Sequence, residues 1–373
     1  MGKLYSYLKL VFFIVILALS FSDVDLSQSN DSFVYVGNSG SYYYNRHRLD
    51  ALNDIGNWSL KGIFDFESII GEGYIQSTAF KSLRHNQFAL PFTPYFYYME
   101  SASFVGRAYV YRLYAKYQME NASIDLGLQR VPFGVGRMWN PTDKYNPVNA
   151  LSVEPSERLG IFGVNYINYV NELSVFQVIT NFKRDMELDK IGLKYKSFVF
   201  GMDMGASYIK SQNFVMTGIE LETNVFDTGL EARAEIAVMN DFHFNKKYTR
   251  GIIGIDYAFP FMLNLVLEYF YNGLGADRKS NYDPGILYDD NWNLARHYLG
   301  ATFNYSLDPL SAISFSTVLN LVDYSWFSGL SLSHSLTDES IMAIGTSLYS
   351  GDSNSEFGSV YKSSYYVKVS HFF

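Results

Sequence analysis

The chain has 373 residues, a formal net charge of −8, no cysteine and an aromatic content of 18%. The lack of cysteine excludes disulfides, thiolate metal sites and thiol catalysis, and the acidic balance argues against nucleic acid as a partner. No apolar run of about 20 residues occurs along the chain, which excludes a helical membrane protein.

The first residues have the pattern of an export signal. Lys3 and Lys9 form a basic start, and the uncharged apolar run 10–21 follows them. This run is too short to span a bilayer as a helix, which needs about 20 residues, but it fits the apolar core of a secretory signal. We therefore expect a cleaved signal peptide over residues 1–22 and a mature chain over 23–373. An uncleaved N-terminal anchor is the alternative.

Apolar and polar residues alternate along segment after segment of the mature chain. In 105–118, Tyr109 and Tyr111 fall on the expected outer face, and Arg112 and Lys116 fall on the opposite face. A strand with one apolar and one charged face suits a membrane barrel with lipid outside and water inside. The residues that we expect to line the lumen are Arg112, Lys116, Lys194, Glu231, Arg233 and Glu235.

The connections between these strands alternate between short and long, as in outer-membrane barrels with tight turns at one end and loops at the other. From Trp58 onward the pattern predicts about 16 strands, and a hairpin within 32–54 would make 18. No change of composition divides the chain. We therefore expect an all-β protein that forms one transmembrane antiparallel up-and-down β-barrel in the bacterial outer membrane.

One long connection, 132–158, differs from the repetitive strands around it. Its two Asn-Pro dipeptides mark tight turns and predict an ordered loop. From Gln129 to Gly160, the run QRVPFGVGRMWNPTDKYNP followed by EPSERLG resembles a segment of a broad group of porin-like outer-membrane barrels. The group's pattern is approximately Gly-Arg-Gln, aromatic-Gly-x-Gly, Trp-Asn-Pro-x-Asp-x-aromatic-Asn-Pro and Glu-Arg-x-Gly. This chain departs from it at Leu128 and Phe133, where Arg and Trp are usual.

The resemblance implies the barrel fold, and members of the group are mostly described as porins or exporters. In the functional interpretation, the loop folds inward, where opposed charges narrow the lumen and set ion preference. In the structural alternative, the loop is a brace tied to the barrel wall. Both interpretations rest on the same residues, which are Arg130, Arg137, Trp139, Asn140, Asp143, Asn146, Glu154 and Arg158.

Signs of enzymatic chemistry are scarce. The sequence has no His-x-x-x-His pair, phosphate loop or nucleophile elbow, so we expect no catalytic residue, cofactor or metal site. His334 and Ser335 are the nearest candidates for a hydrolase, but adjacent residues of a strand point to opposite faces.

The C-terminal residues return to the alternating pattern. Val367, Val369 and His371 share one register with the terminal Phe373, and Lys368 lies in the other. This ending resembles the assembly signal of outer-membrane barrels, whose terminal aromatic residue is read by the insertion machinery. The resemblance implies that Phe373 is the assembly signal here.

The hypothesis favoured by these patterns is a porin-like channel for passive passage of small polar solutes or ions. The alternatives are an outer-membrane hydrolase of lipid or peptide, and a scaffold or export barrel that holds a periplasmic or secreted partner. The expected partners are outer-membrane lipid and lipopolysaccharide, the barrel-assembly machinery and small polar solutes, with no nucleic acid. A homotrimer follows only by analogy with 16-stranded porins.

Overall fold

The computed structural model describes residues 24–37, 40–78, 80–81, 90–147, 154, 157–158, 160–287, 290–359 and 363–373. The expected signal peptide, residues 1–22, lies outside this part. The strands are β1 (Asp25–Val36), β2 (Tyr42–Ile55), β3 (Trp58–Ile70), β4 (Tyr95–Glu100), β5 (Phe104–Gln118), β6 (Ala122–Gln129), β7 (Ile161–Asn171), β8 (Ser174–Phe182), β9 (Leu188–Val199), β10 (Met202–Ser211), β11 (Phe214–Asn224), β12 (Leu230–Asp241), β13 (Lys246–Ala258), β14 (Leu263–Asn272), β15 (His297–Asp308), β16 (Ser311–Asn320), β17 (Trp326–Thr337), β18 (Ser340–Ser350) and β19 (Ser364–Phe372). The described connections also contain two short α-helices, α2 (Glu72–Ile75) and α4 (Glu356–Ser359), and four 3-10 helices, η1 (Arg184–Met186), η2 (Val225–Asp227), η3 (Lys279–Asn281) and η4 (Pro284–Ile286).

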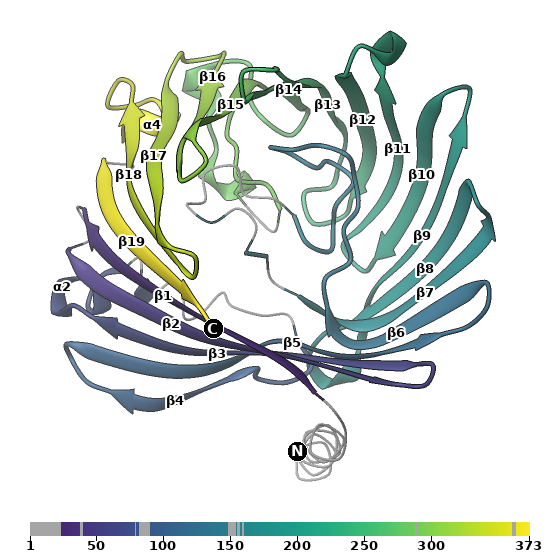
Figure 1. Ribbon diagram of the computed structural model, residues 1–373. Helices are drawn as coiled ribbons and strands as arrows, with labels where there is room; N and C mark the ends of the chain where they lie inside the picture. The colour runs from purple at the N-terminus through teal and green to yellow at the C-terminus, as the bar shows by residue number, and fades with distance from the viewer. Residues whose placement is uncertain are drawn as a thin grey trace.

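The strands form a closed antiparallel barrel (Figure 1). Apart from β4, each strand pairs with the next one along the chain, and β1 pairs with β19 to close the ring. β4 pairs only with the first part of β5, on the edge that β6 occupies further along. The described residues therefore form a ring of 18 strands, which is the 19-stranded sheet without β4.

This architecture confirms the expected all-β up-and-down barrel. The 16 strands predicted from Trp58 onward are present as β3 and β5–β19, and the hairpin suggested within 32–54 is present as β1 and β2. The count of about 16 is too low by this hairpin, and 18 is correct. The hairpin also begins earlier than expected, at Asp25.

The long connections lie at one end of the barrel, which we call the loop end, together with the two-residue turn 212–213. The connections at the other end, which we call the turn end, are all short. Strands of alternating direction place every second connection at the same end. The turn end includes the connections 56–57, 119–121 and 338–339, and the loop end includes 71–103, 130–160, 273–296 and 351–363.

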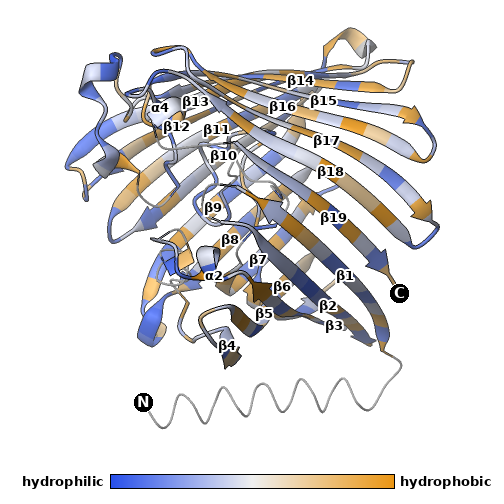
Figure 2. Cartoon of the chain, turned by 90° about the vertical axis from the view of Figure 1, so that its left-hand side faces the viewer, coloured by the Kyte–Doolittle hydropathy of each residue, from blue (hydrophilic) through white to orange (hydrophobic). Residues whose placement is uncertain are grey.

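Side chains alternate between the outer face and the interior. Leu193 and Ile253 are exposed on the outer face, whereas Glu220 and Glu235 are buried inside. Apolar bands therefore run across the strands (Figure 2). No helix among the described residues has the length and apolar character needed to cross a membrane.

A β-bulge in β5 corrects the expected face of two residues. β3 and β5 shift register between Ile63 and Phe64, and Tyr111 has no partner in β3. The extra residue inverts the alternation, so the prediction that Tyr109 and Tyr111 point outward is wrong. Tyr109 is buried, and the Arg107 guanidinium lies 5.5 Å from the centroid of its ring. The Tyr111 ring lies beneath the guanidinium of Arg112, which faces the lumen.

Candidate functional site in the barrel interior

Residues 130–147, which we call the interior segment, leave the end of β6 and lie within the ring of strands (Figure 1). Phe133 and Tyr145 belong to an apolar cluster with side chains of β7, β8 and β10–β12. Met138 and Trp139 belong to a second cluster with side chains of β13–β17 and α4. The barrel's buried apolar core thus lies largely between this segment and the wall.

An inward glutamate of β14 holds the middle of the interior segment. Glu268 is 1% exposed and accepts the backbone N–H groups of Arg137 at 2.9 Å, Met138 at 3.1 Å and Trp139 at 2.8 Å. Hydrogen bonds to an ionised acceptor are stronger than neutral ones, so three of them offset part of the cost of burying the carboxylate. The wall therefore binds the loop through its backbone.

Two further glutamates, on β11 and β12, make the same kind of contact. Glu235 on β12 accepts the N–H groups of Val135 at 2.9 Å and Thr142 at 2.5 Å, and Glu220 on β11 accepts that of Gly134 at 3.1 Å. Gly134 has φ +79°, and a Cβ at this position would lie 2.6 Å from a Glu235 carboxylate oxygen. Glycine is required there both by its backbone conformation and by the close approach.

Trp139 and Asn140, two of the predicted site residues, anchor the segment. The indole ring stacks on Phe270 with centroids 5.2 Å apart, and its Nε1 donates to Asn293 at 3.3 Å. The Asn140 carbonyl accepts the N–H of Asp143 at 3.1 Å, which closes a turn. In this structure both residues therefore fix the position of the segment.

Asp143 and Asn146 organise the second Asn-Pro turn. One Asp143 oxygen accepts the N–H groups of Tyr145 at 3.0 Å and Asn146 at 2.7 Å, and the Asn146 side chain accepts the N–H of Val131 at 2.6 Å. Burial raises the pKa of Asp143 to about 6, although these N–H groups and Arg158, 3.9 Å away, oppose the shift. The loop is ordered through local hydrogen bonds, as its Asn-Pro pairs predict.

A second connection from the loop end reaches the interior segment. Asp290, in 273–296, lies 2.6 Å from the buried ammonium group of Lys144 and 2.5 Å from the Arg250 guanidinium on β13. Burial alone would raise the pKa of Asp290, but the two cations hold it well below its ordinary value. Sequence reasoning missed this ion triad, because Asp290 lies in a non-periodic loop far from Lys144 in the chain.

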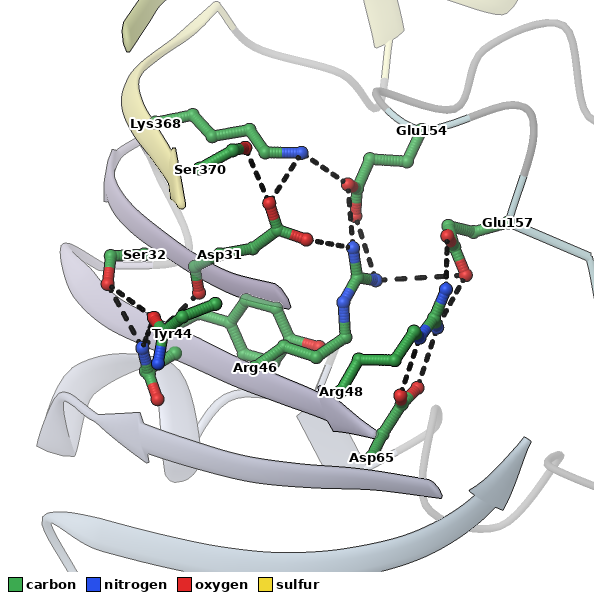
Figure 3. Close-up of polar contacts among 12 residues, drawn as sticks. Asp31, Ser32, Tyr44, Arg46, Arg48, Asp65, Glu154, Glu157, Lys368 and Ser370 are labelled. Carbon is green, nitrogen blue, oxygen red and sulfur yellow. Dashed lines mark hydrogen bonds and ion pairs between the residues drawn. The ribbon is translucent and has the colours of Figure 1, made fainter. Parts of the chain in front are cut away.

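Ion pairs join Glu154 to the seam where β1 meets β19 (Figure 3). Arg46 on β2 lies 2.6 Å from Asp31 on β1 and 3.1 Å from Glu154. Lys368 on β19 lies 3.2 Å from Asp31 and 3.0 Å from Glu154, and Ser370 donates to Asp31 at 2.5 Å. Glu154 therefore contacts cations from both sides of the seam.

Glu157 makes a similar ion pair with Arg48, the next inward arginine of β2. Arg48 on β2 lies 2.9 Å from Glu157 and 2.6 Å from Asp65 on β3. Burial opposes ionisation of Glu157, but Arg48 and Arg46 hold the pKa of its carboxyl below the ordinary value. Arg46 and Arg48 were not among the predicted site residues, although their alternation within the β2 sequence could have identified them as inward charges.

Arg137 reaches a cluster of carboxylates on β11–β13, which we call the acidic wall (Glu222, Glu231 and Asp256). Its guanidinium lies 3.3 Å from Glu222, 3.4 Å from Glu231 and 3.7 Å from Asp256, yet the side chain remains 47% exposed. Arg233 is buried and pairs with Glu231 at 3.4 Å and with Asp256. Three predicted residues thus meet here: Arg137, Glu231 and Arg233.

Three arginines gather on the other side of the interior. Arg112 donates to the backbone carbonyls of Tyr111 and Arg158, both at 2.6 Å. Burial and the nearby charge of Arg130 lower the pKa of Arg158. Arg130 is exposed, and within the described part of the chain it makes no hydrogen bond or ion pair. Cationic charge therefore faces the acidic wall across the interior segment.

The two predicted lumen lysines have different surroundings. Lys194 on β9 lies 2.7 Å from Glu220 and 5.0 Å from the centroid of the Phe133 ring, so it supports the interior segment. Lys116 on β5 lies opposite Ser59 on one side and Asp125 on the other, towards the turn end. Only Lys194 belongs to the constellation around the interior segment.

The remaining candidates lie outside this constellation. His334 faces outward, where its Nδ1 is 2.9 Å from Ser311 Oγ, whereas Ser335 pairs with Ile341 in the opposite register. Phe373 ends the chain at the turn end, exposed, with its N–H donating to the Gln28 carbonyl at 2.9 Å. Among the described residues, no three His, Asp or Glu side chains are grouped so that they could hold a metal ion.

No family model and no curated protein sequence matches this chain. Its fold is similar to that of OccK5 (OpdH) from Pseudomonas aeruginosa, with a TM-score of 0.59 and 8% identity over 94% of this chain and 98% of that one. It is also similar to OccAB2 from Acinetobacter baumannii (TM-score 0.58, 10% identity, 94% and 98% covered). A BenF-like porin from Pseudomonas fluorescens Pf-5 gives a TM-score of 0.58 at 10% identity, with 94% and 99% covered. At identities this low, the similarity establishes a shared porin-like barrel fold.

Proposed function

We propose that this chain is a porin-like channel of the bacterial outer membrane, through which small polar solutes or ions pass passively. The observation that carries the proposal is the interior segment, which is fixed across an 18-stranded ring while its own Arg130 and Arg137 side chains stay accessible to solvent. Barrels of 16–18 strands enclose an aqueous channel, and a fixed loop within such a barrel narrows it.

The charges beside the interior segment support passage of polar species. The acidic wall lies on β11–β13, and Arg112, Arg130 and Arg158 lie on the other side. Opposed charges at a narrow point orient polar solutes and set the balance between cations and anions. A solute that crosses between these two groups meets a field perpendicular to its path.

In this proposal, the contacts that brace the loop against the barrel wall also set the width of the constriction. Glu235 and Glu268 bind the segment's backbone, and Glu154 and Glu157 tie the same connection to β2 and β19. A constriction keeps its width only when its supports are fixed, so the bracing contacts serve the passage itself.

The proposal includes a route to the membrane. Residues 1–22 would direct export, and Phe373 would be read by the barrel-assembly machinery. Lipid and lipopolysaccharide would surround the outer face. Membership in the group of barrels with the pattern seen from Gln129 to Gly160, and assembly as a homotrimer, belong to the same proposal.

Planar-bilayer recording of the purified, folded protein tests the function. We expect discrete conductance steps. We also expect a shift in cation-to-anion preference in Arg137→Ala, because the substitution removes a positive charge that pairs with the acidic wall. The same protein heated until it loses its compact gel mobility is the control. No conductance from folded protein would reject the channel. Release of fatty acid or peptide products would favour the hydrolase, and a stoichiometric co-purifying partner would favour the scaffold or export barrel.

A further inference from the structure

The tight turns at the turn end differ in polarity from one sector of the ring to another. The β9–β10, β11–β12 and β13–β14 turns present Phe200, Phe226 and Met262, which are 92%, 93% and 62% exposed. The β2–β3 turn presents 56–57, which is Gly-Asn, and the β17–β18 turn presents 338–339, which is Asp-Glu. β2 and β3 lie across the barrel from β11 and β12 (Figure 1). We call Phe200, Phe226 and Met262 the apolar turns.

The backbone of the apolar turns does not explain their side chains. Phe200, Phe226 and Met262 have φ of 54°, 50° and 64°, in the left-handed region. Glycine and asparagine adopt this region at the lowest cost, and a bulky apolar residue there is uncommon. Side chains this exposed gain little from packing within the chain either. An apolar contact outside the chain would account for both observations.

The apolar turns continue the apolar outer face. Tyr195 and Met204 lie on the outer face near the β9–β10 turn, and Ile219 and Ile255 lie on the strands that lead to the next two turns; all four are exposed. The strands that the apolar turns join, β9–β14, have 10 to 13 residues each. A strand that crosses a bilayer needs about 9–11 residues, so the turns that end these strands lie at or just beyond the membrane boundary. The surface next to these turns is therefore lipid.

We propose that Phe200, Phe226 and Met262 insert into the lipid interface at the turn end, and that the barrel lies deeper in the membrane along β9–β14 than along β2 and β3. This inference rests on the proposed outer-membrane location. The occupant is the interfacial layer of the bilayer, where aromatic and apolar side chains are favoured. The tips of the polar turns in the opposite sector, 56–57 and 338–339, remain in water.

Site-directed spin labelling tests the inference, because the chain has no cysteine of its own. Single cysteines replace Phe200 or Phe226, with Asn57→Cys and Glu339→Cys as matched controls in polar turns. The labelled full chain is reconstituted into phosphatidylethanolamine–phosphatidylglycerol vesicles. Access of each label to oxygen, which partitions into lipid, is compared with access to a water-soluble nickel chelate. We expect an oxygen-to-nickel ratio several-fold higher at 200 and 226 than at 57 and 339.

Equal ratios in the two sectors, in protein that floats with the vesicles, would overturn the inference and leave the channel proposal standing. Protein that does not float with the vesicles would instead count against the outer-membrane location.

A second measurement covers the case in which the cysteine variants fold poorly. Phe226→Asn suits the left-handed backbone better but removes the apolar contact. We expect it to lower the thermal midpoint in vesicles, and an unchanged or higher midpoint would overturn the inference. If the labels are accessible to nickel in vesicles but protected in native envelopes, the turns contact a protein partner. This result would also overturn the inference.

Discussion

Replacing Glu268 with alanine should release the interior segment while the barrel remains closed. The carboxylate accepts the backbone N–H groups of Arg137, Met138 and Trp139 in a buried site. A buried donor left without a partner costs about 1–3 kcal/mol, so three give roughly 3–9 kcal/mol before relaxation. β14 keeps its backbone pairing with β13 and β15 in the variant. The segment can reduce the cost by leaving the wall, so the lumen should widen.

Single-channel conductance of Glu268→Ala measures this widening, and heat-modifiable gel mobility shows that the barrel has folded. We expect larger conductance steps than in the parent protein. Glu231→Ala is the matched control, because Glu231 also faces inward but contacts the side chains of Arg137 and Arg233. It should change ion preference with little change of width. Parent-like conductance in folded Glu268→Ala would refute the reasoning.

Three other outcomes follow from the structure. Leu193→Arg places a charge on the outer face and should lower the free energy of unfolding by about 2–4 kcal/mol if the residue lies at the membrane midplane. Lys194→Arg, on the inner face, should leave this free energy nearly unchanged, and urea unfolding from vesicles measures both variants. Deleting Phe373 should reduce the heat-modifiable barrel in outer-membrane fractions without reducing export, and an unchanged yield would contradict its proposed role as the assembly signal. Burial raises the pKa of Glu356 from 4.5 to about 7, so its carboxyl binds a proton more tightly when folded, and the stability that it contributes should fall as pH rises from about 5 to about 7. The thermal midpoint should fall over this interval, and less so in Glu356→Gln.

The fold was predictable because a barrel wall repeats one local rule. Leu193 and Lys194 alternate between outside and inside as a period of two requires, and this rule alone identifies most strands. The rule fails in β5, where the bulge at Tyr111 adds one residue and turns Tyr109 inward. A bulge leaves no reliable mark in an alternating sequence. The face to which residues beyond a bulge point can therefore be assigned only when their pairing partners are known.

The candidate site was predictable only in part. Trp139 and Asp143 stood out because they belong to a dense local motif, and the structure places both in the interior segment. Their partners did not stand out. Arg46 meets Glu154 across 108 residues of sequence, and Asp290 comes from a connection without periodicity. Such contacts depend on the closed ring, and no local pattern of charge specifies them.

The ion pairs of Glu154 have a consequence for the order of assembly. Its cationic partners are Arg46, near the start of the barrel, and Lys368, on the strand that closes it. Contacts so distant in sequence form late, because the chain between them must first be ordered. Sealing of the seam and fixing of the loop that carries Glu154 should therefore be one concerted event. In the proposed channel, a nascent barrel would then never be both closed and wide, so maturation itself would protect the cell from an unregulated leak.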